Sequence, residues 1–419
     1  MSEKSLLASL EHCPCGRDHD RAQPLLDFAP GAMTRLPETL RRAGLPDRLR
    51  VVADGNGLAA CPELLDILRA GGFSWEMTRF DDVRGAKIED ARRVLTESKK
   101  NAALLAVGTG SLHDLCRYAA FETKKPLALL ATAPSMDGFA STVAPIFRDG
   151  FKDTLPGASP RCVVAPPEVL SAAPLALRAA GFGDIVGKVT ALFDWHVARL
   201  AAGEYHCPRV EALTRDAYAK TTALAQGVRA GTPEAMAALM EALTLSGLCI
   251  QASGLSRPAS GGEHHMAHYW EIRATNEGDT PPFHGLCVGA ATPVLIEHYK
   301  RFAAGPCPEI RIPSFSAEQL RDHYGRLYPH VRRENTPDPL RGIDPARLRT
   351  GWPDIQTLAA ALPDPAQLRA LLRAAGAPDT PQALGLPDGW VEDALRYACY
   401  IRSRLTLLRL TQQQETTNS

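Results

Sequence analysis

The chain has no excess of charge of either sign. Among its 419 residues, Lys and Arg together number 47 and Asp and Glu together number 47, so the formal net charge at pH 7 is zero. Proteins that bind nucleic acid or an anionic membrane surface usually carry a basic excess or a basic patch. The balance of charge gives no reason to expect either partner, and we expect neither.

Long apolar runs are also missing. No stretch approaches the roughly 18 apolar residues that a membrane-spanning helix needs, and the charged start MSEKSLLASLEHCPCGRDHD lacks the apolar core and cleavage site of a secretory signal. The ten cysteines are scattered, and several lie inside apolar patterns, for example Cys116, Cys249 and Cys287. Such spacing is typical of reduced, buried thiols rather than of a disulfide framework. We therefore expect a cytoplasmic protein without a membrane span.

The first 168 residues differ in pattern from the rest. Short apolar strands are predicted at 49–54, 74–80, 103–108 and 126–132, and they alternate with amphipathic helical runs at 61–72, 88–100 and 111–125. This alternation predicts a mostly parallel sheet covered by helices on both faces. From residue 169 to 419, Ala- and Leu-rich helical periods dominate and residues 335–390 read as short helices with loops. We expect an α/β domain over 1–168 and an all-helical domain over 169–419. The helical periods are 174–201, 209–229, 232–256, 264–271, 283–303 and 391–412.

A glycine-containing turn joins the predicted strand 103–108 to the helix that follows. Gly108 and Gly110 would let the backbone approach a pyrophosphate, and the helix N-terminus offers N–H groups and the positive end of a dipole. Ser111 would cap the helix or donate to a phosphate oxygen. His113 stands where the fingerprint G-x-G-x-x-G has its third glycine, so a plain tight turn is an equal alternative. Asp54 ends another strand, where it would either hold the ribose hydroxyls of NAD or form a turn.

The next junction carries several polar side chains. The segment TAPSMDGFAS follows the strand 126–132 and gathers Thr132, Ser135 and Ser141 around Asp137. Loops at the carboxyl ends of parallel strands are where α/β sheets bind ligands. A polar loop that caps the next helix would explain one hydroxyl more easily than three, so the pattern favours a ligand site.

Three segments of the helical half carry metal-ligand chemistry. Asp184 is one of them, His264 and His268 lie four residues apart on one helix, and His284 opens another helix. One carboxylate and two neutral imidazoles, with room for water or substrate, are how proteins hold a catalytic divalent metal. A lone histidine on an apolar helix is more often a core or cap residue, but the combination favours a metal site.

The segment CPCGRDH near the N-terminus presents a second set of metal-binding residues. Cys13, Cys15 and His19 could bind zinc, with His12 as a further candidate. However, C-x-C is not the usual C-x₂-C spacing of structural zinc sites, and no second cysteine pair lies nearby in the sequence. The spacing therefore favours an N-terminal turn that contains two thiols.

Five segments, taken in order and spacing, resemble one known family. GTGSLHD, TAPSMDGFAS, GFGDIVGK, RPASGGEHHMAH and HGLCVGA look like motifs of the bacterial and archaeal sn-glycerol-1-phosphate dehydrogenases. That family shares a superfamily with iron-type alcohol dehydrogenases, glycerol dehydrogenase and dehydroquinate synthase. The resemblance covers residues from about 50 to 300, and CPCGRDH is similar to the bacterial branch.

The resemblance implies an N-terminal Rossmann-like α/β domain, a helical domain after it, and an active site in the cleft between them. It assigns dinucleotide binding to Asp54, Gly108, Thr109, Gly110, Ser111, Leu112, Thr132, Ala133, Pro134, Ser135 and Ser141. It assigns the metal to Asp184, His264 and His284, with His265 as the poorer ligand candidate. It assigns substrate contacts to Asp137, Asp184, Lys188 and His268, of which Asp184 and His268 would be catalytic, and His268 would either contact the substrate or relay a proton to the alkoxide.

The resemblance also implies a reaction, in which NADH or NADPH reduces dihydroxyacetone phosphate reversibly to sn-glycerol 1-phosphate. The cofactors would be NAD(P)H and one divalent metal per chain (zinc, nickel or iron), the assembly a homodimer, and the biological setting phospholipid metabolism. Iron-type alcohol dehydrogenases have a fourth ligand, a histidine, where this chain has Lys188, which would face a substrate phosphate or form a structural ion pair. A polyol or sugar-phosphate dehydrogenase and a dehydroquinate-synthase-like cyclase are the alternatives, and Asp184 weighs against the cyclase branch, which typically has Glu there.

Overall fold

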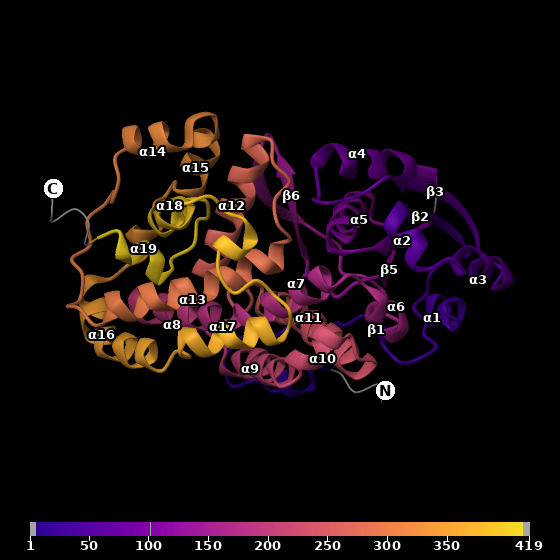
Figure 1. The fold of residues 1–419 in the computed structure, drawn as a ribbon, viewed down its shortest axis with the longest axis horizontal. Helices are drawn as coiled ribbons and strands as arrows, with labels where there is room; N and C mark the ends of the chain where they lie inside the picture. The colour runs from indigo at the N-terminus through magenta and orange to yellow at the C-terminus, as the bar shows by residue number, and fades with distance from the viewer. Residues whose placement is uncertain (1–5, 101, 414–419) are drawn as a thin grey trace.

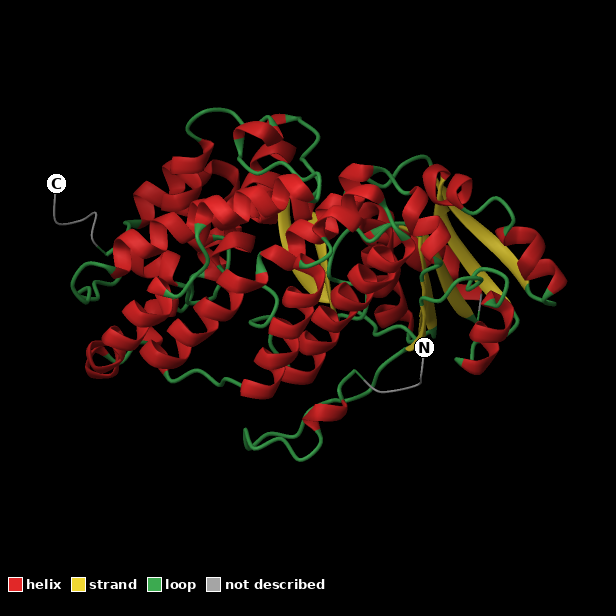
Figure 2. Ribbon diagram, turned by 60° about the horizontal axis from the view of Figure 1, so that its bottom comes forward, coloured by secondary structure: helices red, strands yellow, loops and turns green. Residues whose placement is uncertain are grey.

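The main sheet of the protein lies at one end of an elongated molecule, most of its helices lie at the other, and a two-stranded hairpin at residues 143–156 lies between them. A computed structural model describes residues 6–100 and 102–413, and Figures 1 and 2 show this division. Within the described residues, all strands fall between residues 25 and 164, whereas the chain from residue 167 on forms helices α6 to α19 joined by loops and short 3₁₀ turns. The α/β class expected from the alternating pattern is therefore confirmed.

Six parallel strands form the main sheet, in the order β1-β8-β5-β4-β2-β3. Crossover helices connect the central strands, as parallel pairing requires. The carboxyl ends of β4 and β5 lie side by side, because Gly108 pairs with Ala131 in the register. The strands are β1 (Leu25–Asp27), β2 (Arg48–Asp54), β3 (Ser74–Phe80), β4 (Ala103–Gly108), β5 (Leu127–Ala131) and β8 (Cys162–Val164), and the helices among them are α1 (Leu36–Arg42), α2 (Gly55–Ala60), α3 (Leu64–Ala70), α4 (Ile88–Glu97) and α5 (Gly110–Thr123).

Alternate residues of each strand pack into two different cores, as the twofold repeat of a β-strand dictates. In β4, Leu105 and Val107 face a core shared with α1 and α3. Leu104 and Ala106 face the opposite core, which continues without interruption through α5 into the helical half. The sheet and the helical half therefore share one packed interior, which holds the carboxyl edge of the sheet against the helices.

Four strands agree with the sequence prediction to within one residue at each end, and four others were missed. The predicted strands 49–54, 74–80, 103–108 and 126–132 correspond to β2, β3, β4 and β5. The missed strands are β1, β8, and the antiparallel hairpin of β6 (Val143–Arg148) and β7 (Phe151–Pro156). β1 and β8 are three residues long, too short for an alternating pattern to be visible in the sequence.

The helical half contains every helical period predicted for it, several of them divided. The predicted run 174–201 is split at Gly187 into α7 and α8, and 209–229 is split into α9 and α10. The region 335–390 contains a 16-residue helix, longer than the short helices expected there. The helices are α6 (Pro167–Ala172), α7 (Leu175–Val186), α8 (Lys188–Ala202), α9 (Pro208–Thr222), α10 (Ala225–Ala230), α11 (Pro233–Ser253), α12 (Gly262–Glu277), α13 (His284–Ala303), α14 (Ala317–Tyr324), α15 (Tyr328–Glu334), α16 (Pro345–Ala360), α17 (Pro365–Ala374), α18 (Trp390–Tyr397) and α19 (Leu407–Thr411).

The N-terminal segment crosses to the helical half before it enters the sheet. Figure 1 shows this indigo segment beneath α9, and the guanidinium of Arg209 donates hydrogen bonds to the carbonyl oxygens of Ser9 and Glu11. Near the start of β1, the amide of Gln251 in α11 donates to the carbonyl oxygen of Ala22. The division into domains at residue 168 stays a prediction, and residues 6–22 contact helices on its far side.

One helix, α11, is long and apolar enough to cross a membrane by length and composition alone. Its most apolar window is 83% buried inside the protein. The helix packs between other helices of the helical half, so its apolar composition is explained by its place in the core.

Helices α7 and α13 approach each other more closely than any side chain would allow. A Cβ atom at Gly183 would overlap the carbonyl oxygen of Gly285, and one at Gly285 would overlap that of Ala180. Glycine lets two helix backbones meet at such a crossing because it has no side chain. The crossing matters for function because it sets the distance between Asp184 on α7 and His284 on α13.

We expect Gly183→Ala to lower the free energy of unfolding by about 1–3 kcal/mol, because the new methyl group forces α7 and α13 apart. Chemical denaturation would measure this change. Gly342→Ala is the matched control, since its new Cβ would meet only the Cβ of Ala202 at 4.0 Å, and it should change the unfolding free energy by no more than about 0.5 kcal/mol. Equal effects of the two substitutions would contradict the steric argument.

Candidate functional site

A cleft opens where the carboxyl edge of the sheet meets the helical half. Its volume, open mouth included, is about 1210 Å³. One wall consists of the α5 N-terminus and the loop after β5, and the other of α12, the start of α13 and the segment between α18 and α19. Of the residues predicted from sequence, the cleft is lined by Thr109, Ser111, Ser135, Asp137, Ser141, His264, His268 and His284.

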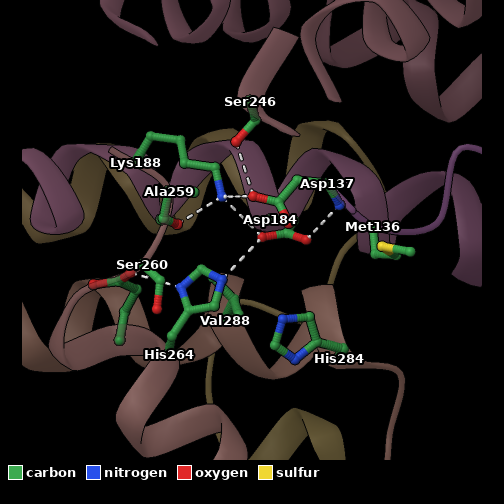
Figure 3. A network of polar contacts seen from close by, with 12 residues as sticks. Met136, Asp137, Asp184, Lys188, Ser246, Ala259, Ser260, His264, His284 and Val288 are labelled. Atoms are coloured by element: carbon green, nitrogen blue, oxygen red, sulfur yellow. Dashed lines mark hydrogen bonds and ion pairs between the residues drawn. The ribbon is translucent and has the colours of Figure 1, made fainter. Parts of the chain in front are cut away.

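The carboxylate of Asp184 is completely buried and contacts two of the residues that line the cleft, His264 and Asp137. Its Oδ1 accepts a hydrogen bond from Lys188 Nζ at 3.1 Å, and its Oδ2 accepts one from the backbone N–H of Asp137 at 3.0 Å (Figure 3). Burial acts to raise the pKa of Asp184, but the Lys188 ammonium and the hydrogen bond from His264 hold it well below its usual range. Asp184 is therefore ionised at neutral pH.

Two histidines face Asp184, and a glutamate holds each of them from behind. Nδ1 of His264 lies 2.7 Å from Glu263 Oε1, and Nδ1 of His284 lies 2.6 Å from Glu271 Oε1. Because a carboxylate oxygen can only accept, each Nδ1 carries the hydrogen and each Nε2 is left as the basic atom. Carboxylates in this position orient metal-binding histidines and raise their basicity.

Glu271 is ionised, which lets it hold the His284 ring. Burial acts to raise its pKa, but the charge of Lys152, with which it forms an ion pair, and the hydrogen bond from His284 lower the pKa to about 2. A permanently ionised Glu271 holds the His284 ring in one tautomer throughout the neutral pH range.

The possible metal-ligand atoms of the two histidines and Asp184 lie close together. One ligand atom from each of Asp184, His264 and His284 lies within 4.8 Å of the others, and His264 Nε2 is 3.4 Å from Asp184 Oδ1. A lone pair that faces a carboxylate oxygen at this distance is unfavourable unless a cation lies between them. Burial acts to lower the pKa of His264, but the carboxylates of Asp184 and Glu263 raise it above its usual value. The raised pKa favours a proton on His264 Nε2, between the ring and Asp184. The donor set fits a divalent metal, which would take the place of that proton.

His268 lies beside this group in a different hydrogen-bonding environment. Its ring centroid is 5.0 Å from that of His284, and its Nδ1 is 2.9 Å from Nη2 of Arg402. A guanidinium only donates, so Nδ1 of His268 is the acceptor and its hydrogen is on Nε2. Burial and the charges of Lys152 and Arg402 keep the pKa of His268 well below its usual value. His268 is a neutral hydrogen-bond donor at neutral pH.

Lys188 has an entirely internal role. Its ammonium is 1% exposed and donates three hydrogen bonds, to Asp137 Oδ2 at 2.6 Å, to Asp184 Oδ1, and to the Ala259 carbonyl oxygen at 2.9 Å (Figure 3). These bonds use all three of its hydrogens. Of the two interpretations left open by the sequence, the geometry favours the structural ion pair over contact with a substrate phosphate.

The predicted nucleotide-binding residues divide into two groups. Thr109, Ser111, Ser135 and Ser141 line the cleft, and the backbone N–H of Gly110 donates to Ser135 Oγ at 3.1 Å, which ties the α5 N-terminus to the loop after β5. The others lie behind this surface. They are Gly108, Leu112, Thr132, Ala133 and Pro134, at the ends of β4 and β5 or in the first turn of α5.

Asp54 lies outside the cleft and its carboxylate has local partners. Its Oδ1 accepts from the Gly57 N–H at 2.7 Å, which caps α2, and its Oδ2 accepts from the Val83 N–H at 3.3 Å. The side chain is 3% exposed. This is the turn-forming alternative, and the assignment of Asp54 to a ribose stays a prediction.

Several side chains in the cleft were missed by the sequence analysis. Arg402 and Arg404 reach it from the segment between α18 and α19, more than 130 residues after His268 in the chain. No local pattern marks them, because their position depends on how the C-terminal segment packs. Glu263 and Glu271 do have a signal, since both lie on the histidine-bearing helix α12, one before His264 and the other three after His268.

Known proteins resemble this chain in sequence over almost its full length. Residues 27–174 match the family of iron-containing alcohol dehydrogenases. A glycerol-1-phosphate dehydrogenase [NAD(P)+] of Halalkalibacterium halodurans is 33% identical over 94% of this chain and 94% of its own length. The enzyme of the same name from Geobacillus stearothermophilus is 32% identical over 97% of this chain and 96% of its own length.

Solved structures share the fold at much lower sequence identity. An archaeal alcohol dehydrogenase from a Red Sea brine pool has a TM-score of 0.64 at 16% identity, covering 97% of this chain and 100% of that one. A probable glycerol dehydrogenase from Sinorhizobium meliloti has a TM-score of 0.59 at 17% identity, covering 95% and 98%. These likenesses confirm the expected Rossmann-like domain followed by a helical one. By its similarity to the curated relatives, the chain belongs to the glycerol-1-phosphate dehydrogenase family, within the superfamily of iron-containing alcohol dehydrogenases.

Proposed function

We propose that this protein reduces dihydroxyacetone phosphate reversibly to sn-glycerol 1-phosphate, with NADH or NADPH and one divalent metal ion. The observation that carries the proposal is the convergence of Asp184, His264 and His284, whose two imidazoles are each backed by a glutamate. The relatives that match almost the whole chain bear the name of this activity.

Asp184, His264 and His284 would hold the metal. One carboxylate and two imidazoles suit zinc, nickel and iron(II) alike. When bound, the metal supplies Lewis-acid polarisation of the ketone and the reduced nicotinamide supplies the hydride. Lys188 and Asp137 fix the Asp184 carboxylate from the opposite side, so its orientation does not depend on the metal.

His268 would donate a hydrogen bond to the substrate from Nε2. Its hydrogen is on that atom because Arg402 donates to Nδ1, and its lowered pKa keeps the ring neutral. A neutral imidazole stabilises developing negative charge on oxygen as a donor, without giving up its proton. We therefore assign His268 to polarising or positioning the substrate, and the proton for the alkoxide comes from another group or from solvent.

Arg402 and Arg404 would bind the substrate phosphate. Arg404 donates to the Ser260 carbonyl oxygen and to Ser256 Oγ, each at 2.6 Å, which fixes its guanidinium at the cleft wall. Within the described residues, neither arginine forms an ion pair with a carboxylate, so both charges are available for an anion. Burial and the charges of Arg257 and Arg402 lower the pKa of Arg404, a sign of the repulsion that a bound phosphate would relieve.

The dinucleotide would lie on the other wall, with its pyrophosphate at the N-terminus of α5. The helix dipole and the hydroxyls of Ser111 and Thr109 favour an anion there. Asp137 lines the cleft between this wall and the metal-binding atoms, in a position to hold a substrate hydroxyl. The homodimer stays a prediction from the resemblance and the cytoplasmic location a prediction from the composition, and the sequence leaves the choice between NAD and NADP open.

Removing one of its ligands tests the metal site. We expect His264→Leu to lose the metal ion held by Asp184, His264 and His284 and to reduce kcat for dihydroxyacetone phosphate by at least about 10³-fold, a loss of several kcal/mol in transition-state stabilisation. Leucine has roughly the volume of imidazole but no ligand atom. Elemental analysis and the decrease of reduced-nicotinamide absorbance would measure the two effects, and a chelator should abolish activity of the unaltered protein.

His265→Leu is the matched control for that experiment. His265 is the neighbouring residue, is also buried, and has no hydrogen-bond partner on either ring nitrogen within the described residues. It should keep both the metal and the activity. Full activity of the metal-free protein, or of His264→Leu, would refute the metal-dependent mechanism.

Substitution of Arg404 tests the phosphate contact. We expect Arg404→Met to lower kcat/KM for dihydroxyacetone phosphate about 10- to 100-fold, the value of one charge-assisted hydrogen bond of about 1.5–3 kcal/mol. The same substitution should change kcat/KM for unphosphorylated dihydroxyacetone less than about threefold, because that ketone presents no charge. Arg341→Met, at an exposed arginine that does not line the cleft, is the control. Equal losses with both ketones would show that Arg404 acts on the fold rather than on the phosphate.

A further inference from the structure

A second group of potential metal ligands lies outside the cleft and shares no residue with it. Cys13, Cys15 and His19 from the N-terminal segment meet Cys207, the residue directly before α9. One ligand atom from each lies within 4.8 Å of all the others. Residues almost 190 positions apart in the chain are therefore brought to one point by the fold.

The distances in this group are close to those of a zinc site. Sγ of Cys13 is 3.5 Å from Sγ of Cys207, and Nε2 of His19 is 3.2 Å from Sγ of Cys15 and 3.5 Å from Sγ of Cys207. A tetrahedral zinc ion with Zn–S bonds of about 2.3 Å and a Zn–N bond of about 2.0 Å spaces its ligand atoms roughly 3.5–3.8 Å apart. Small side-chain movements would open the group to that size.

The ring of His19 is already oriented for coordination. Its Nδ1 lies 2.8 Å from the carbonyl oxygen of Ala252 at the end of α11. A carbonyl oxygen only accepts, so Nδ1 carries the hydrogen and Nε2 presents its lone pair to the three sulfur atoms. A backbone carbonyl behind a histidine is a usual outer partner of a metal ligand.

Hydrogen-bond donors lie beside two of the three sulfur atoms. The N–H of Val210 donates to Sγ of Cys207, 3.5 Å away, at the N-terminus of α9, where the helix dipole favours negative charge. The hydroxyl of Tyr205 lies 3.2 Å from Sγ of Cys15, and the guanidinium of Arg17 stacks on the Tyr205 ring. Three thiolates, one neutral imidazole and Zn²⁺ carry one net negative charge, and Arg17 lies beside it.

A disulfide between Cys13 and Cys207 is the competing interpretation. It would form if an oxidant removed two electrons and the two thiol protons left, bringing the sulfur atoms from 3.5 Å to about 2.05 Å. That bond would leave the third thiol, Cys15, and the oriented His19 without a role. A metal ion uses all four groups, so the geometry favours the metal.

We propose that Cys13, Cys15, His19 and Cys207 bind one structural zinc ion, which fastens the N-terminal segment to the helical half. Four protein ligands close the coordination shell, as structural zinc sites require. The ion would hold the segment against α9 and the end of α11, next to the hydrogen bonds of Gln251 and Arg209 with the same segment. The site needs no substrate and is independent of the proposed reaction.

Cobalt substitution tests the proposal on the unaltered full-length protein. Purified under reducing conditions and loaded with Zn²⁺, the protein should contain two metal ions per chain, one at each group. Loaded with Co²⁺, it should show intense near-ultraviolet sulfur-to-cobalt charge-transfer absorption. Asp184, His264 and His284 cannot produce that band because they offer no sulfur, so the band reports on the thiolate site alone.

Variants separate the two sites. Cys15→Ser, at a half-buried position, should bind one metal ion per chain instead of two and lose most of the charge-transfer absorption. Cys307→Ser, at a half-buried cysteine outside the group, should keep two ions and the full band. His264→Leu should lose one ion but keep the band, so failure of the proposed function and failure of this proposal give different results.

Two outcomes would overturn the proposal. One is a single metal ion per chain without sulfur-to-cobalt absorption in the unaltered protein, which needs no variant and therefore does not depend on how Cys15→Ser folds. The other is a Cys13–Cys207 disulfide in peptide maps of protein prepared without reductant, with no metal at these residues even after reduction. That result would make the group a redox cross-link instead.

Discussion

The buried carboxylate of Asp184 is the constraint on which the rest of the site depends. An ionised carboxylate with no contact to water is stable only if cations and hydrogen-bond donors surround it. Lys188, the Asp137 backbone and His264 provide this environment, and each comes from a different part of the chain. Their positions in turn hold the loop after β5 against α7 and α12, which closes one end of the cleft.

The close packing of α7 and α13 serves the same centre. Gly183 and Gly285 let the two helix backbones touch, so that Asp184 and His284 face each other across the crossing. Larger residues there would separate the ligands by the width of a side chain. A metal site built on two packed helices is held more rigidly than one built on loops, since the core around the helices resists deformation.

Both ends of the described chain contribute to the helical half rather than extending away from it. The segment between α18 and α19 brings Arg402 and Arg404 to the cleft, where Arg402 also sets the tautomer of His268. The N-terminal segment packs on α9 and α11, and α11 carries Ser246, which donates to Asp137 at 2.8 Å. The site is thus supported by segments that lie far from its own motifs in the sequence.

Local sequence determined the elements and the identity of the principal groups. The strands β2 to β5 and the helices that bear Asp184, His264 and His284 follow from apolar periodicity, because period and run length are properties of neighbouring residues. The motifs around these residues were sufficient to indicate the family, which the relatives confirm. The strands β1 and β8 were missed because three residues carry no measurable period, and they exist only through pairing with β5 and with each other.

Tertiary structure alone decided which partners each group has. Lys188 pairs with Asp137, 51 residues away in the chain, and Asp54 accepts from the Val83 N–H, 29 residues away. Cys207 joins the CPCGRDH segment, whose thiols the sequence could not complete into a site. Hydrogen-bond partners, buried charges and ligand sets arise between residues that are distant in the chain, and a single sequence contains no distance between such residues. The amino-acid sequence therefore determined which chemical groups this protein has and on which elements they lie, whereas the packing of those elements decided which groups meet.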